Sequence, residues 1–140
     1  MATLVPNPQY TVWGASDSRG PSGYDQVVEW YERLQAAGRN RLDYVIHRVV
    51  ADRSCVVTEG DFHYAIAGRH LDGVTATERG EVVRPDDYHL ISHRTTVLWP
   101  VTPEGLIEGE HIYSGERHRV IRRLGAGELP HLGPIERENQ

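Results

Sequence analysis

The chain has 140 residues and a formal net charge of −5 with its histidines neutral, a length that fits one domain. A negative balance disfavours nucleic-acid binding, because neutralising phosphates needs a basic face. All 15 basic residues are arginines. Schiff-base chemistry on a lysine and a lysine-dependent phosphate loop are therefore both excluded.

The sequence also carries no sign of a membrane or secretory protein. No apolar run approaches the roughly 18 residues that a membrane span needs. The first residues lack the basic stretch and long apolar run of a secretory signal. The one cysteine, Cys55, can form no internal disulfide. We therefore expect a soluble, cytoplasmic protein without nucleic-acid or membrane partners.

The first half of the chain predicts a strand, a loop and a helix. Residues 10–13 are β-branched and aromatic and predict a short strand, and residues 14–23 are rich in Gly, Ser, Asp and Pro and predict a loop. Apolar residues then recur at helical spacing. This stripe consists of Tyr24, Val27, Val28, Tyr31 and Leu34. Gly38 suits the residue just past the end of the helix.

After the helix the hydrophobic period changes to two, which is typical of strands. Residues 42–51 and 55–66 predict a hairpin. One face of its first strand is expected to carry Leu42, Tyr44, Ile46 and Val50. Residues 67–86 predict a long polar loop, and residues 88–101 and 106–113 predict two strands joined by a Thr-Pro-Glu-Gly turn. A sheet of this kind with one helix predicts an α+β fold that encloses a cavity.

Several local strings, in this order, resemble the nuclear-transport-factor-2-like (SnoaL-like) superfamily. The matching strings are Gly20 to Asp25 opening a helix, Val56 to Gly60 on a strand, Trp99 to Ile107 across a hairpin, Glu110 to Tyr113, and Arg123 to Gly125. The resemblance implies a cone-shaped, curved antiparallel sheet packed on a helix. It implies one SnoaL-like domain over residues 1–125, followed by a flexible polar tail over residues 126–140.

The superfamily includes ketosteroid isomerases, limonene-epoxide hydrolases, polyketide cyclases and non-catalytic pocket proteins. Its members usually begin with two helices before the first strand, and only Met1 to Val5 could represent the end of the second one. The chain thus resembles a member that is truncated at its N-terminus.

The catalytic residues of two of these enzyme groups do not carry over. The Arg and two Asp residues of the epoxide hydrolases fall at Gly60, Phe62 and Ile112, and the ketosteroid isomerase acid falls at Val97. The isomerase base falls near Trp13 or Gly14. Residues without an ionisable group cannot move a proton or stabilise an oxyanion. We expect neither activity, whereas the cyclase acid aligns with Gly115 or Glu116 and leaves that route open.

Strand alternation predicts which side chains face the pocket. With the turn at residues 102–105, we expect Val101 to pair with Leu106 and Val97 with Glu110. The inner side chains are then His89, Ile91, His93, Thr95, Val97 and Trp99, with Glu108, Glu110 and Ile112, and with Phe62 and Tyr64 on the neighbouring strand. The outer face is expected to carry Thr96, Leu98 and Tyr113.

We predict that Glu110 and His93 are the catalytic pair, because a carboxylate can orient and charge a histidine. The ligand-binding residues are predicted to be Trp13, Phe62, Tyr64, Thr95, Val97, Trp99, Glu108 and Ile112. The alternative is that Glu110 and His93 lie half-exposed at the rim or are hydrogen-bonded in the sheet. We expect no metal and no cofactor, since His89 and His93 lie about 13 Å apart on a strand.

Two functions remain open at this point. The first is an acid–base lyase, isomerase or cyclase acting on an apolar small molecule, and the second is a non-catalytic ligand-binding or dimeric interaction module. An enzyme needs a titratable group deep in the cavity with a charge partner, whereas a binding module needs only shape. We also expect a homodimer through the outer face, since the helix covers only one face of an antiparallel sheet.

Overall fold

The computed structural model describes residues 3–14, 20–36 and 42–128, which form one helix and six strands. The elements are β1 (Leu4–Trp13), α1 (Tyr24–Ala36), β2 (Leu42–Ala51), β3 (Cys55–Ala67), the 3-10 helix η1 (Gly68–His70), β4 (Tyr88–Pro100), β5 (Ile107–Ser114) and β6 (Arg119–Arg123). The predicted helix and five strands are confirmed, and β6 was not predicted. The first strand begins at Leu4 instead of residue 10, so Leu4 and Val5 belong to a strand and not to the end of a helix. Gly38 and the tail beyond residue 128 lie outside the described residues.

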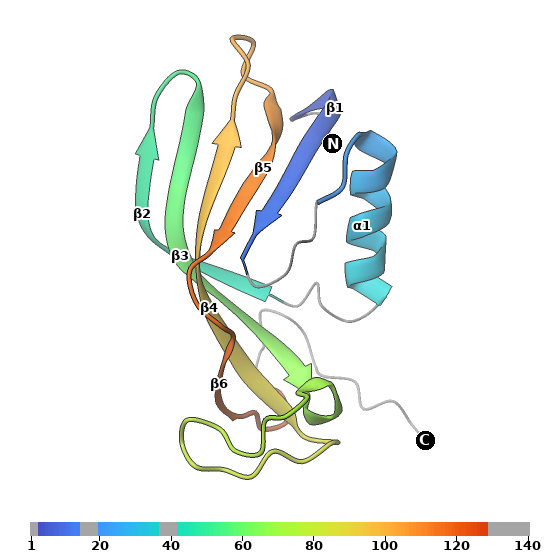
Figure 1. The fold of residues 1–140 in the computed structure, drawn as a ribbon, viewed down its shortest axis with the longest axis vertical. Helices are drawn as coiled ribbons and strands as arrows, with labels where there is room; N and C mark the ends of the chain where they lie inside the picture. The colour runs from blue at the N-terminus through green and yellow to red at the C-terminus, as the bar shows by residue number, and fades with distance from the viewer. Residues whose placement is uncertain (1–2, 15–19, 37–41, 129–140) are drawn as a thin grey trace.

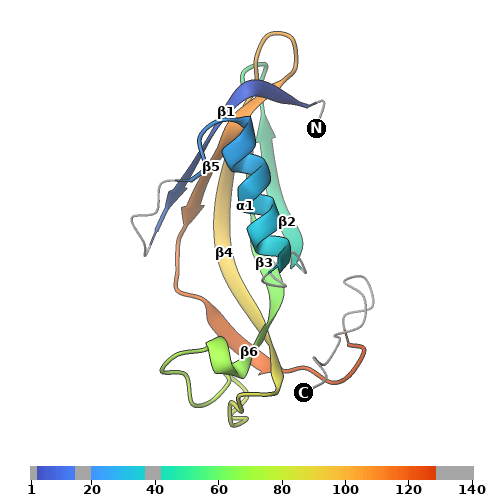
Figure 2. The same ribbon diagram turned by 90° about the vertical axis from the view of Figure 1, so that its right-hand side faces the viewer.

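The six strands form one curved sheet with the order β1-β5-β4-β3-β2, and β6 pairs with the far half of β4. Figure 1 shows the long strands bending, with α1 on the concave side of the bend and β6 at the lower end, and Figure 2 shows α1 lying over one face of the sheet. The α+β class is confirmed. The sheet is mixed rather than antiparallel, however, because β1 runs parallel to β5.

The predicted pairing of β4 with β5 is confirmed, but its register is wrong by two residues. Val101 bridges Ile107 instead of Leu106, and further along Val97 pairs with Ile112 instead of Glu110. The turn is one residue longer than expected, and Gly109 adds one more residue to β5. A Cβ at Gly109 would collide with the backbone of β1. Because side chains alternate with period two, the slip of two leaves Glu110 and Ile112 on their predicted inner face. Glu108 lies between the two irregularities and is slipped by one, so it lies on the outer face, which corrects its predicted place on the inner one.

A second irregularity overturns one predicted face. The register of β2 with β3 shifts between Ile46 and Arg48, so His47 is an additional residue. Val50 consequently pairs with Val57 and lies on the face opposite to Ile46, which corrects the prediction that the two share a face. Gly60 lies directly beside this bulge, where a Cβ would meet the main chain of β2.

The inner face of β4 forms the centre of the molecule. Its side chains are at most 1% exposed at His89, Ile91, Thr95 and Val97. Val27 of α1 is fully buried as well. No helix among the described residues is long and apolar enough to cross a membrane. The division into a domain over residues 1–125 and a tail stays a prediction.

Candidate functional site

Glu110 lies where three strands meet the helix. Its partners come from the other elements: Tyr31 of α1 donates its hydroxyl to Oε1 of Glu110 over 3.5 Å, and Trp99 of β4 and Tyr10 of β1 also hydrogen-bond the carboxyl group. The Tyr10 and Tyr31 hydroxyls lie 3.5 Å apart. A single carboxyl group is thus surrounded by three aromatic donors.

Burial dominates the electrostatics of this cluster. It raises the pKa of Glu110, while the hydrogen bonds from Trp99, Tyr10 and Tyr31 act in the opposite direction without cancelling it. Burial likewise raises the pKa of Tyr10 and of Tyr31, and the nearby Glu110 charge adds to both shifts. The tyrosines therefore stay protonated donors, and Glu110 titrates closer to neutrality than an exposed carboxyl group.

The rings next to this site support its geometry. Tyr10 contacts Trp30 edge to face with the ring centroids 5.8 Å apart, and Trp30 contacts Tyr31 at 5.1 Å. Tyr10 itself is 5% exposed, whereas Tyr31 is 41% exposed. Tyr31 therefore connects the buried hydroxyl of Tyr10 and the carboxyl group of Glu110 with the surface.

A second cluster lies further along β4 and is built from stacked rings. His93 stacks on Phe62 of β3 at 5.5 Å and on His118, before β6, at 4.5 Å. Phe62 in turn stacks on Tyr44 of β2 at 4.2 Å. Tyr64 contacts His93 edge to face, and its hydroxyl lies 2.7 Å from Nδ1 of His118. Four rings thus form a ladder across the inner face.

His93 is neutral in this environment. Burial, with the neighbouring His118, lowers its pKa to about 4, against the smaller opposite effects of Glu116 and Asp61. Its Nδ1 is buried and has no hydrogen-bond partner among the described residues. The same holds for Oγ1 of Thr95 and for both ring nitrogens of His89. Buried polar atoms of this kind are where a water molecule or a ligand group is expected.

The structure does not bring the predicted catalytic pair together. Continuing the register of β4 and β5 places Glu110 opposite Trp99, with which it hydrogen-bonds. Trp99 and His93 are six residues apart on one strand, which corresponds to about 20 Å. Glu110 and His93 therefore belong to two separate clusters on the same face.

The other predicted site residues divide between the inner face and solvent. Phe62 and Tyr64 share the inner face with their partners on β4, and Thr95, Val97 and Ile112 line it between the two clusters. Glu108 is exposed. Trp13 pairs with Tyr113 on the outer face, stacks on its ring at 6.2 Å and is 53% exposed, because the parallel register of β1 turns it away from Glu110. That position does not fit the predicted role of Trp13 as a ligand-binding residue of the inner face.

Sequence reasoning missed Tyr10, Tyr31 and His118 as site residues. Tyr31 could have been found, because it belongs to the apolar stripe of the helix and a tyrosine there directs its hydroxyl at the sheet. Tyr10 could not, since its neighbourhood depends on the parallel pairing of β1 with β5.

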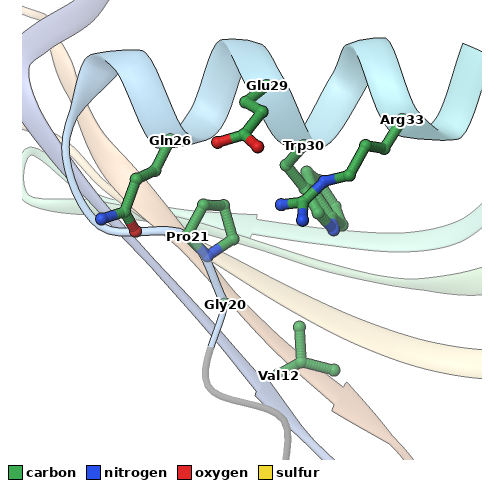
Figure 3. Close-up of a pocket in the computed structure, with 7 residues that line it drawn as sticks. All are labelled: Val12, Gly20, Pro21, Gln26, Glu29, Trp30 and Arg33. Carbon is green, nitrogen blue, oxygen red and sulfur yellow. The ribbon is translucent and has the colours of Figure 1, made fainter.

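A hollow of about 310 Å³ lies between α1 and the end of β1 (Figure 3). Its lining consists of Val12, Gly20, Pro21, Gln26, Glu29, Trp30 and Arg33. It is separate from the predicted pocket, since it includes none of the predicted site residues. The part of the chain that the structure describes holds no group of three His, Cys, Asp or Glu side chains suited to a metal ion.

Comparison with solved structures identifies the fold. SalBIII, an epoxide hydrolase/cyclase-like enzyme with a role in pyran ring formation in polyether salinomycin, matches with a TM-score of 0.57 and 14% identity over 85% of this chain and 78% of its own. An NTF2-like protein from Anabaena variabilis matches with a TM-score of 0.56 and 13% identity over 83% and 72%. The chain has the nuclear-transport-factor-2-like fold.

A third neighbour with this fold, from Jannaschia sp. CCS1, is assigned as a SnoaL-like polyketide cyclase, with a TM-score of 0.55 and 15% identity over 81% of this chain and 68% of its own. No protein-family model and no curated protein sequence matches the chain. At these identities the similarity establishes the fold that was expected from the sequence, and the function has to be argued from the site.

Proposed function

We propose that the chain binds an apolar small molecule on the inner face of its sheet and that Glu110 is the acid–base group of that site. The observation that carries this proposal is the desolvated carboxyl group of Glu110 with its raised pKa, held by the hydroxyl of Tyr31. A carboxyl group that titrates closer to neutrality can both accept and return a proton. The half-exposed Tyr31 can donate a hydrogen bond to an oxygen of the substrate.

The lining of the inner face and one structural neighbour support a proposal for the substrate class. Val97 and Ile112 are apolar and lie between the two clusters, and Thr95 and His93 offer polar atoms without partners among the described residues. An apolar molecule with a few oxygen functions would fit such a face. The epoxide hydrolase/cyclase-like role of SalBIII suggests a hydroxy-epoxide that closes to a pyran ring. As the hydroxyl oxygen bonds the epoxide carbon and the epoxide C–O bond breaks, Glu110 would accept the proton of the hydroxyl group. The released epoxide oxygen would take a proton from the hydroxyl of Tyr31, which Glu110 would then return.

The test compares Glu110→Gln with Glu108→Gln, because Glu108 is an exposed carboxylate on the same strand. An apolar 5,6-epoxy alcohol serves as the probe, because attack of its hydroxyl group on the nearer epoxide carbon closes a pyran ring, and its conversion to the cyclic ether is followed by chromatography. We expect Glu110→Gln to lower turnover at least ~100-fold, the usual effect of losing a general acid or base. Glu108→Gln should stay within a few-fold of the wild type. Turnover by Glu110→Gln within a few-fold of the wild type would refute the catalytic role.

A non-catalytic ligand-binding module is the second candidate, and the separation of Glu110 from His93 favours it. Glu110 is then left without the charge partner that the sequence predicted. The same probe distinguishes the two functions: binding that quenches tryptophan fluorescence, without any conversion, supports the module. Trp99 and Trp30 lie in or beside the Glu110 cluster and would report it.

We further propose a homodimer through the outer face of the sheet. Trp13 and Tyr113 support it, because they stack on each other there and are 53% and 42% exposed. Contiguous exposed aromatic surface is typical of interfaces. Sedimentation of the wild type against Tyr113→Arg tests the contact, and an unchanged sedimentation coefficient would contradict it.

A further inference from the structure

β2 is an unusual edge strand, because all of its residues except Tyr44 are exposed and many of them are apolar. It ends the order of the sheet, and in the described part of the chain it pairs only with β3 (Figure 1). Its exposed hydrophobic side chains are Leu42, Val45, Ile46, Val49 and Val50, with exposed fractions between 39% and 60%. An open edge of this length with apolar residues on both faces is a surface on which another strand can pair.

Because of the bulge, the faces and charges of β2 are arranged symmetrically about Val45, which its sequence alone does not show. Leu42 and Val49 both pair with inner residues of β3, while Asp43 and Arg48 both pair with outer ones. If the bulged residues after Val45 count as one position, Asp43 lies two positions before Val45 and Arg48 lies two positions after it. The faces and charges are therefore arranged symmetrically about Val45.

We propose that two copies of the chain pair antiparallel through their β2 edges, with the two-fold axis at Val45. Val45 then lies opposite its own equivalent on the outer face. Asp43 of each copy lies opposite Arg48 of the other, and Leu42 lies opposite Val49 on the inner face. The two bulged residues of each copy, Ile46 and His47, together lie opposite Tyr44 of the other. Inner-face residues therefore stay opposite inner-face residues on both sides of the bulge.

A second copy fits this edge because several side chains meet their complements. Val45 meets its own equivalent on the outer face and Leu42 meets Val49 on the inner face. Asp43 and Arg48 form two opposite-charge pairs, which stabilise directly opposed positions of a sheet. Arg48 can reach this pairing, since its side chain is 74% exposed and its ion pair with Glu59 is long, with Nε and Oε2 3.9 Å apart. The pairing would join two curved sheets into one continuous sheet. This interface is distinct from the proposed outer-face contact at Trp13 and Tyr113.

Exchanging the charges tests the register. Asp43→Arg alone places two arginines opposite each other at both ends, and Arg48→Asp alone places two aspartates there. We expect each single variant to weaken dimerisation roughly tenfold, because two attractive pairs become two repulsive ones. An equimolar mixture of the two single variants should restore the wild-type dissociation constant, because each end of the mixed dimer again has one arginine and one aspartate.

A disulfide across the axis tests the geometry, in a Cys55→Ser background. Residues directly opposite each other in an antiparallel pair have Cα atoms about 4.5–5.5 Å apart, within the range of a disulfide. Val45→Cys should therefore cross-link two chains under mild oxidation. Val49→Cys is the matched control: it is at least as exposed on the same strand, but its equivalents lie about 20 Å apart in the proposed dimer.

Native mass spectrometry and non-reducing gels read both tests, and circular dichroism confirms that each variant is folded. Selective cross-linking at position 45 with restoration by the mixture supports the β2 dimer. A wild-type chain that is monomeric at micromolar concentration overturns it. So does a dimer that Tyr113→Arg dissociates while position 45 stays unlinked, since that result assigns self-association to the outer face alone.

Discussion

His93 should make the stability of this fold strongly dependent on pH, and its replacement by phenylalanine isolates that effect. Burial and His118 lower the pKa of His93 from 6.5 to about 4. The folded chain therefore binds fewer protons at this position than the unfolded chain between these two values. The part of the free energy of unfolding that depends on neutral His93 is fully present above pH 6.5 and is lost as the pH falls toward 4.

The expected size follows from the two pKa values. By proton linkage, the free energy of unfolding should fall by about 2 kcal/mol between pH 7 and pH 5 on account of His93 alone. His93→Phe keeps a ring in the stack between Phe62 and His118 and removes the titration. Its stability should therefore fall by about 2 kcal/mol less than that of the wild type over the same interval.

Urea unfolding followed by circular dichroism at pH 7 and pH 5 measures both proteins, and titrating groups that do not contact His93 contribute equally to the two. An NMR titration of the imidazole provides an independent value for His93. Equal losses of stability in the two proteins, or an imidazole that titrates above pH 6, would refute the burial of His93 in the stack.

Three further predictions concern the framework of the site. Asp61→Asn should lower the free energy of unfolding by about 1–2 kcal/mol at pH 7, because the Arg94 hydrogen bonds hold the pKa of Asp61 at about 2. Urea unfolding should show this difference disappearing as the pH falls from 3.8, the ordinary pKa, to 2. Ile91→Ala should cost about 2–5 kcal/mol by the same measurement, since Ile91 is 1% exposed. Gly60→Ala should lower the melting temperature, because its Cβ would meet the main chain of β2, whereas Gly115→Ala, which has open space, should not.

The sequence was sufficient to predict helices and strands where the hydrophobic periodicity is strong. It predicted α1 and the strands β2 to β5, and it assigned Glu110 and Ile112 to the inner face although the register was wrong by two. That success depended on two irregularities of one residue each, a longer turn and the insertion at Gly109, which together restore the alternation. A single one of them would have exchanged the faces.

Periodicity could not reveal contacts that depend on bulges or on pairing between distant strands. The bulge at His47 separates Val50 from Ile46 although both fit one alternating pattern. The parallel pairing of β1 with β5 turns Trp13 outward and brings Tyr10 to Glu110. Neither feature has a local sequence signal, because both are set by the partner strand.

The separation of Glu110 from His93 has a consequence for any activity of the inner face. The two residues lie about 20 Å apart along β4, well beyond the 7–10 Å over which substitutions usually couple. Glu110→Gln and His93→Phe should therefore change the free energy of unfolding additively, to within about 0.5 kcal/mol. If probe binding is instead weakened by both variants and their effects are coupled, a single ligand must extend across Val97 and Ile112 from one cluster to the other. A double-mutant cycle on unfolding and on probe binding thus measures how much of the inner face one ligand occupies.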